Sequence, residues 1–262
     1  MTMNKSLNII MNKKLTGLLL GLMLFTMSGT ASALLILSGD SNIGNALDGS
    51  FGAPVNTDNQ TWFSNILGSG TTVQIQDEYF SGSVLDSTNA INNYYNGLGG
   101  VSSSLFSGTI TDTSLSGVDL FLSVLPSNAY TASETSALQN FLGGGGTLFL
   151  LGENSSFSTE NSRINALLTA LGSSMSLGNV LLDGDFNTTT NIDADPLNTG
   201  VTDFTYAATT NVVSGGTSLI RTLNGTTFIA YESTTVPEPS VLALLGLGPV
   251  SYTHLRAHET RR

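Results

Sequence analysis

Two polar segments each follow a short apolar run, and their side chains are of types that perform acid–base or nucleophilic chemistry. The apolar runs cover residues 34–38 and 147–151. Runs of this kind are typical of buried parallel strands, and ligands of open α/β sheets bind outside the carboxyl ends of such strands. If the two strands are neighbours, we expect the polar residues that follow them to share a ligand crevice. These residues are Asp40, Ser41, Glu153 and Asn154.

The chemistry open to this crevice depends on which residues could act as a base. Two carboxylates side by side could perform general acid–base catalysis or hold a cation. The segment Gly39-Asp40-Ser41 resembles the nucleophile block of the SGNH esterases, but there is no histidine between residues 34 and 240 to activate Ser41. The alternative is structural: Asp40 caps the segment after the strand, and Asn154 caps the following helix.

A third candidate site is an acidic loop that begins like a calcium-binding loop. Asp183, Asp185 and Asn187 have the Asp-x-Asp-x-Asn spacing. The pattern then departs from the calcium loop, because Thr188 stands where Gly makes the turn and Ala194 stands where a bidentate Glu closes the site. The loop is either an irregular Ca²⁺ site or a solvated acidic segment. We expect no other cofactor.

The charge of the chain excludes several classes of function. Residues 34–240 contain eighteen Asp and Glu and two Arg, with no Lys, His or Cys. A chain with this much negative charge repels phosphate backbones and anionic membranes. We therefore expect no nucleic-acid partner. The absence of Cys and His also excludes disulfides and thiolate or imidazole metal sites in this region.

Alternating apolar patterns predict the elements that would position these residues. A capping box at Thr131 and Glu134 begins one helix, and Asn224-Gly225 predicts a hairpin turn between the last two strands. The strand at 34–38, the helix after it and the next strand are expected to form a βαβ unit, and the segment from 99 to 117 is expected to be a loop. Strands are predicted at 34–38, 71–75, 118–125, 147–151, 201–207, 217–223 and 226–232, and helices at 56–67, 84–98, 131–142 and 158–171. The expected fold class is α/β: a Rossmann- or flavodoxin-like, mostly parallel sheet with flanking helices and a β-rich C-terminal part.

The N-terminus has the pattern of a secretory signal peptide. Lys13 and Lys14 precede the apolar run 15–27, and the small residues 28–33 follow it. We expect residues 1–33 to be the signal peptide, with cleavage by signal peptidase after Ala33, because the apolar run is short for a membrane anchor. At the other end, residues 250–262 resemble a translated sequencing adapter, so we expect no selected structure there. A single α/β domain over 34–235 is therefore expected.

The segment 236–249 resembles a truncated PEP-CTERM sorting signal. Pro237, Glu238 and Pro239 form the Pro-Glu-Pro motif, and an apolar segment rich in Leu, Ala and Gly follows it. The family's further apolar residues and Arg cluster are missing here. The resemblance implies recognition by an exosortase in a Gram-negative, exopolysaccharide-producing bacterium. It also implies transient anchoring in the inner membrane, followed by release to the cell surface or the extracellular matrix.

Residues 118–154 resemble the core of the class I glutamine amidotransferase-like, flavodoxin-like folds, in which a strand, a helix and a Gly-Gly strand follow one another. Enzymes of that superfamily use a Cys and a His, and neither is present, so the activity is not expected here. We therefore expect an exported, exopolysaccharide- or biofilm-associated protein with a non-catalytic binding or structural role. Polysaccharide or another matrix component is the expected partner. The alternative is an extracellular hydrolase that uses the carboxylates or Ser41.

Overall fold

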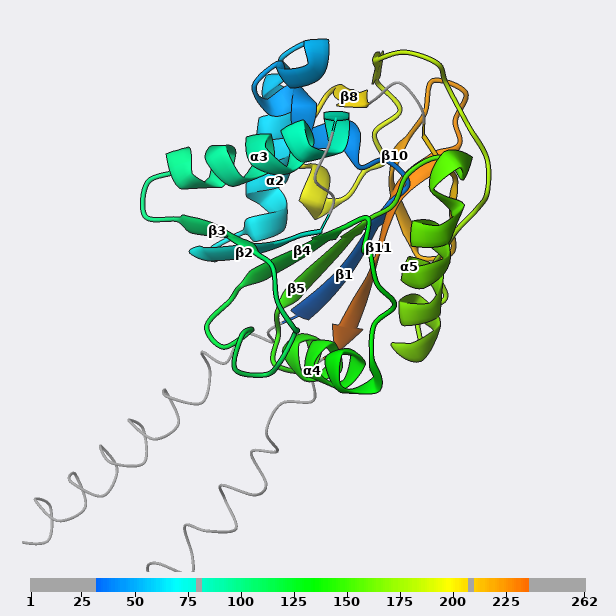
Figure 1. Ribbon diagram of the computed structural model, residues 1–262. Coiled ribbons are helices and arrows are strands. Elements are labelled where there is room, and N and C mark those ends of the chain that lie inside the picture. Colours follow the sequence, from blue (N-terminus) through cyan, green and yellow to red (C-terminus); the bar gives the residue numbers. More distant parts are fainter. Residues whose placement is uncertain (1–31, 79–81, 207–209, 236–262) are drawn as a thin grey trace, which may run out of the picture. The chain divides into compact units, whose positions relative to one another are not determined.

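A computed structural model describes residues 32–78, 82–206 and 210–235, which belong to one compact unit (Figure 1). Its centre is a seven-stranded sheet in the order β10-β11-β1-β5-β4-β2-β3. The neighbouring pairs β1–β5, β5–β4, β4–β2 and β2–β3 are parallel, whereas β11 pairs antiparallel with both β1 and β10. The strands are β1 (Ser32–Ser38), β2 (Thr72–Asp77), β3 (Ser102–Phe106), β4 (Leu120–Val124), β5 (Thr147–Leu151), β10 (Thr217–Arg221) and β11 (Thr227–Thr235).

Helices cover both faces of this sheet (Figure 1). Aromatic and aliphatic residues of α2 and α3 pack on one face, and those of α4 and α5 pack on the other. The α-helices are α2 (Thr57–Leu67), α3 (Gly82–Gly97), α4 (Ala132–Gly143) and α5 (Ser158–Ala170). Short 3-10 helices are η1 (Asn42–Leu47), η2 (Ser50–Gly52), η3 (Ser155–Phe157) and η4 (Pro196–Asn198). Two small sheets pair β6 (Ser176–Leu177) with β9 (Val213–Ser214), and β7 (Asn187–Thr189) with β8 (Phe204–Tyr206).

The predicted α/β class is confirmed, and local sequence signals explain most of the elements. Asn56 caps α2 by accepting hydrogen bonds from two backbone N–H groups, and the predicted capping box of Thr131 and Glu134 begins α4. The Asn224-Gly225 turn joins β10 to β11, with Gly225 at a φ of 79°. These signals depend only on neighbouring residues, which is why the sequence predicts them well.

The order of the strands differs from a simple βαβ unit. Strands β1 and β2 are parallel and α2 connects them, but β5 and β4 lie between them in the sheet. Every residue of β4 and β5 is buried, whereas β2 contains both buried and half-buried residues. Strands that are apolar on both faces belong at the centre, where helices cover both sides. The nearly continuous apolar sequences of β4 and β5 therefore explain their central position.

The prediction of a loop over residues 99–117 is wrong for one part of that segment. Residues Ser102–Phe106 form β3, which pairs in parallel with β2 at the edge of the sheet. Only Ser103 of this strand is buried, so the segment has no apolar alternation that would reveal a strand. Backbone hydrogen bonds to β2 form the strand in spite of its serine-rich sequence.

The first and last strands of the fold are antiparallel neighbours. In their ladder, Ser32 pairs with Thr235 and Ser38 pairs with Ile229. Most of the predicted signal peptide, the Pro-Glu-Pro motif and the segment 250–262 lie outside the described residues, but Ala33 lies within β1. No helix among residues 32–78, 82–206 and 210–235 is both long and apolar enough to cross a membrane.

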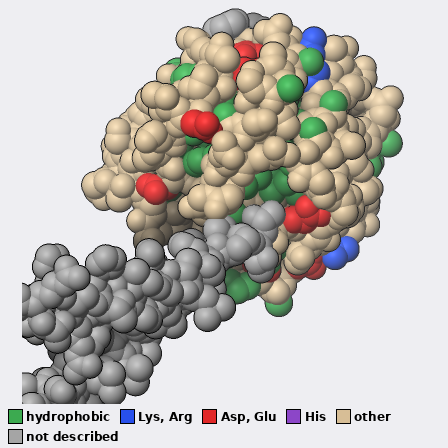
Figure 2. Space-filling view, turned by 90° about the horizontal axis from the view of Figure 1, so that it is seen from below, with side chains coloured by type: hydrophobic (Ala, Val, Ile, Leu, Met, Phe, Trp, Pro, Cys, Tyr) green, Lys and Arg blue, Asp and Glu red, His purple; other side chains and the backbone are tan. Residues whose placement is uncertain are grey.

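The surface carries few charges for its size. Figure 2 shows one face on which uncharged polar side chains and backbone predominate, with acidic and basic groups in small, separate places. The described residues contain two ion pairs, Arg163 with Glu160 and Arg221 with Asp193. The remaining carboxylates therefore have no basic side chain to balance them.

Candidate functional site

The candidate crevice residues meet at the carboxyl edge of the sheet. Strands β1 and β5 are neighbours, and Ser38 pairs with Leu151 at their ends. The loops that follow these strands therefore start side by side. We call the residues gathered there the carboxyl-edge cluster: Asp40, Ser41, Asn42, Glu153 and Asn154.

Glu153 is the centre of the carboxyl-edge cluster and accepts hydrogen bonds from both loops. Its Oε2 accepts from the Ser41 hydroxyl at 2.8 Å, from the Ser41 backbone N–H at 3.3 Å and from the Asn42 amide at 2.7 Å. Its Oε1 accepts from the backbone N–H and the side-chain amide of Asn154, at 2.9 and 3.0 Å. One carboxyl group thus ties the loop after β1 to the loop after β5.

Asp40 and Asn154 make the capping contacts expected from the structural interpretation. The Asp40 carboxylate accepts from the backbone N–H of Asn42 at 2.7 Å, at the start of η1. The Asn154 side chain accepts from the backbone N–H of Ser156 at 2.8 Å and so caps η3. Both residues therefore hold the backbone of their own loop in addition to surrounding Glu153.

Two effects disfavour ionisation of the Glu153 carboxyl: its burial and the neighbouring Asp40. Burial is the main cause that raises the pKa of Glu153 to about 8, and repulsion from Asp40 adds to it. Hydrogen bonds from Asn154 and Ser41 act in the opposite direction. The two described arginines do not compensate the pair, since Arg163 binds Pro126 and Glu160 and Arg221 binds Asp193.

The carboxyl-edge cluster is closed, which differs from the open crevice that we predicted. Asp40 and Ser41 are 0% exposed, Glu153 is 1% exposed, and the two asparagines are at most 7% exposed. The backbone of Asn211 covers β1, since its N–H donates to the Gly39 carbonyl at 2.8 Å. From α3, the Ser87 hydroxyl donates to the Ser41 carbonyl at 2.7 Å. The chain itself fills the place where a ligand of an open sheet would bind.

Sequence reasoning missed the residues that complete this closure. Asn161 of α5 accepts from the Glu153 N–H and donates to its carbonyl. Asn211 donates through its side chain to the same carbonyl at 3.0 Å. Nothing in the sequence distinguishes these asparagines from the many others, because their role depends on which loops the fold brings together.

The contact between Ser41 and Glu153 is the one feature of the cluster that resembles a catalytic pair. A carboxylate within 2.8 Å of a hydroxyl has the distance required of a general base. A reacting carbonyl would also have to reach the Ser41 oxygen, and that residue has no exposed surface. The arrangement thus suits the stabilisation of two loops, whereas turnover would require the covering segments to move.

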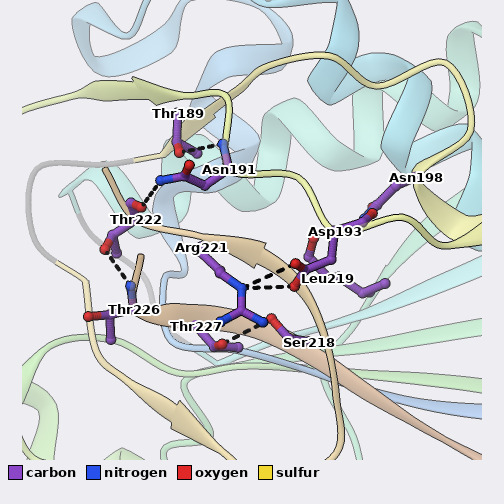
Figure 3. Close-up of polar contacts among 10 residues, drawn as sticks. All are labelled: Thr189, Asn191, Asp193, Asn198, Ser218, Leu219, Arg221, Thr222, Thr226 and Thr227. Carbon is purple, nitrogen blue, oxygen red and sulfur yellow. Dashed lines mark hydrogen bonds and ion pairs between the residues drawn. The ribbon is translucent and has the colours of Figure 1, made fainter. Parts of the chain in front are cut away.

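The acidic loop at 183–187 forms hydrogen bonds within the protein. Asp183 accepts a hydrogen bond from the Tyr206 hydroxyl at 2.6 Å, and the Asp185 carbonyl accepts one from the Asn187 amide at 2.7 Å. Farther along, Asp193 pairs with the Arg221 guanidinium, which Figure 3 shows beside the hydrogen bonds of Asn191 and Thr222. Among the described residues, no three acidic, His or Cys side chains form a metal-binding group. Calcium binding at Asp183, Asp185 and Asn187 stays a prediction.

Two surface cavities lie at the opposite, amino edge of the sheet. They have volumes of about 390 and 380 Å³ and share Val118, Gly144 and Gly146 among their lining residues. Each is lined by one carboxylate, Asp112 or Asp119, and both accept hydrogen bonds from the protein. None of the predicted site residues lines them.

Fold and site together define an α/β protein with a mostly parallel sheet and a closed polar cluster at its carboxyl edge. No protein-family model matches the chain, and no curated protein matches it. Among solved structures, the chain is similar to one described as the mmIFT52 N-terminal domain, with a TM-score of 0.39 and 17% sequence identity. The match covers 45% of this chain and 62% of that one, less than two thirds of its length. A likeness at this level carries no functional argument.

Proposed function

We propose that the chain is an exported protein of the cell surface or extracellular matrix with a non-catalytic binding or structural role. Signal peptidase removes the N-terminal segment, and an exosortase recognises the segment around Pro237, Glu238 and Pro239. Transient anchoring in the inner membrane precedes arrival at the surface. Exopolysaccharide or another matrix component of a biofilm is the expected partner.

The main support for a non-catalytic role is the burial of the residues of the carboxyl-edge cluster that could act as nucleophile or base. Ser41 and Asp40 are 0% exposed and Glu153 is 1% exposed. Their polar atoms bind one another and the backbone of adjacent loops. Buried, hydrogen-bonded polar groups help to hold a fold together, whereas catalytic groups must reach a substrate.

The export route is tested at the 3′ end of the gene and in the cell. Resequencing that end from source DNA is expected to give a reading frame that continues past Gly248 with apolar residues and then several arginines. In cells that lack the host exosortase, the protein is expected to stay in the inner membrane and not to reach the surface. Cell fractionation with and without the enzyme measures this. The anchoring proposal is contradicted if the reading frame encodes polar residues after Gly248, or if the location of the protein is the same with and without the exosortase.

The second candidate function is an extracellular hydrolase, favoured by the 2.8 Å contact between the Ser41 hydroxyl and Glu153. Hydrolysis of p-nitrophenyl acetate by the purified protein separates the two functions. We expect a rate equal to that of the Ser41→Ala variant, whose loss of one buried hydrogen bond costs about 1 kcal/mol of stability. A wild-type rate that falls at least tenfold in Ser41→Ala, with the variant still folded by circular dichroism, supports the hydrolase.

A further inference from the structure

The ladder between β1 and β11 extends to the very start of the described chain. Ser32 pairs with Thr235, Ala33 with Thr234 and Leu34 with Ser233. Strand β1 lies inside the sheet, between β11 and β5. Residues 32 and 33 are thus part of the folded domain, which begins two residues before the domain start predicted from the sequence.

Ala33 also belongs to the core. Its side chain is 0% exposed and lies in the apolar cluster that includes Leu35, Leu37 and Ala230. Cleavage after Ala33 would remove this side chain and the two ladder pairs that Ser32 and Ala33 form with Thr235 and Thr234. It would also place the new, charged amino group on Leu34, a half-buried residue. Each of these changes costs folding free energy.

The sequence offers a second cleavage site of the same type two residues earlier. Signal peptidase accepts small residues at the first and third positions before the cut. Ala31 and Ala33 satisfy this rule for a cut after residue 33, whereas Gly29 and Ala31 satisfy it for a cut after residue 31. The local pattern permits both, and the structure supplies a reason to choose.

The geometry points to signal peptidase cleavage after Ala31, so that the mature chain begins at Ser32 and keeps the full β1–β11 ladder. This inference rests on the proposed export and assigns its processing site. The new amino group then lies at the end of the ladder. The Pro-Glu-Pro motif, beginning at Pro237, follows the other end of the same ladder after one residue, so both processing signals flank the folded domain directly.

N-terminal sequencing of the exported full chain, produced in a Gram-negative host, tests this site. The expected first residues are Ser-Ala-Leu-Leu. A mature chain that begins at Leu34, or at any residue other than Ser32, overturns the inference but leaves export standing. A chain that keeps its leader contradicts the proposed export itself, so the two failures are distinguishable.

Two matched substitutions sharpen the test, because each affects one cut only. Gly29→Leu places a large residue at the third position before the Ala31 site and leaves both small residues of the Ala33 site in place. It is expected to abolish the Ser32 terminus. Ala33→Val removes the small residue directly before the later cut and is expected to leave the Ser32 terminus unchanged. Pulse-labelled protein is sequenced, so that slow folding of Ala33→Val does not obscure the result. The opposite pattern, with Ala33→Val blocking processing, overturns the inference.

Discussion

Glu153 is almost completely buried and has a second carboxyl group, Asp40, nearby. Buried carboxyl groups are normally paired with a cation, and none is present among the described side chains around this one. Five hydrogen bonds from Ser41, Asn42 and Asn154 take the place of a cation. Burial and repulsion from Asp40 nevertheless raise the pKa of Glu153.

This arrangement predicts that stability falls as the pH rises. Burial and the neighbouring Asp40 raise the pKa of Glu153 from 4.5 to about 8. The folded chain therefore binds the proton more tightly than the unfolded chain. Its contribution is fully present below the unfolded pKa and is lost as the pH rises through the folded one. We expect the free energy of unfolding to fall by a few kcal/mol between about pH 5 and 8, measured by urea denaturation.

Substitution of Glu153 identifies the group responsible. Glu153→Gln replaces the carboxyl by a neutral group of similar shape, so it removes the titration and is expected to flatten the pH dependence. Glu160→Gln is the matched control, since Glu160 lies on α5 in a partly exposed ion pair with Arg163. Other titratable groups near the cluster are Asp183 and Tyr206, and burial raises the pKa of Tyr206 so that it stays neutral in this range. An unchanged slope in Glu153→Gln would falsify this account.

At the scale of elements, the carboxyl edge is closed by the segment around Asn211 lying directly on the end of β1. The close approach requires a glycine, because a Cβ at residue 39 would lie 2.2 Å from the Asn211 carbonyl oxygen. The backbone of Asn211 cannot rotate away as a side chain could. Gly39 therefore determines how tightly this segment covers the carboxyl-edge cluster.

Gly39→Ala is expected to destabilise the protein by about 2–4 kcal/mol, because the covering segment must shift and lose its hydrogen bond to residue 39. Urea denaturation gives the loss, and faster hydrogen exchange at the Asn211 amide locates it. Gly97→Ala is the control, because nothing lies within 4 Å of a Cβ at the end of α3 and alanine favours the helix. Equal stabilities of the two variants would argue against a tightly held closure.

At the scale of the whole molecule, uncompensated negative charge opposes the compact state. Residues 32–235 contain seventeen Asp and Glu against two Arg. Mutual repulsion of so many carboxylates destabilises the folded chain at low ionic strength, and salt screens it. The same surplus keeps anionic polymers away, so any matrix partner is expected to be neutral or cationic.

Added NaCl is therefore expected to raise the melting temperature by a few °C between about 10 mM and 0.5 M, measured by scanning calorimetry. CaCl₂ at matched ionic strength provides the comparison. A further increase with calcium that disappears in Asp183→Asn would support the predicted site at Asp183, Asp185 and Asn187. A melting temperature that does not respond to either salt contradicts the importance of charge repulsion.

The sequence alone determined those features that depend on neighbouring residues. The Thr131 capping box, the Asn56 cap, the Asn224-Gly225 turn and the buried runs at 34–38 and 147–151 each carry a local physical signal, and together they predicted an α/β fold. The acidic composition is likewise a property of the sequence.

Only the tertiary structure decided which of these elements meet. The positions of β4 and β5 between β1 and β2, the serine-rich strand β3, and the closure of the carboxyl-edge cluster by Asn161 and Asn211 depend on contacts between residues far apart in the chain. Propensity and periodicity do not encode such contacts, because strand order is set by the packing of whole faces. Ala33 illustrates the same limit. In the sequence it is a small residue suited to cleavage, whereas in the folded sheet it is a core residue.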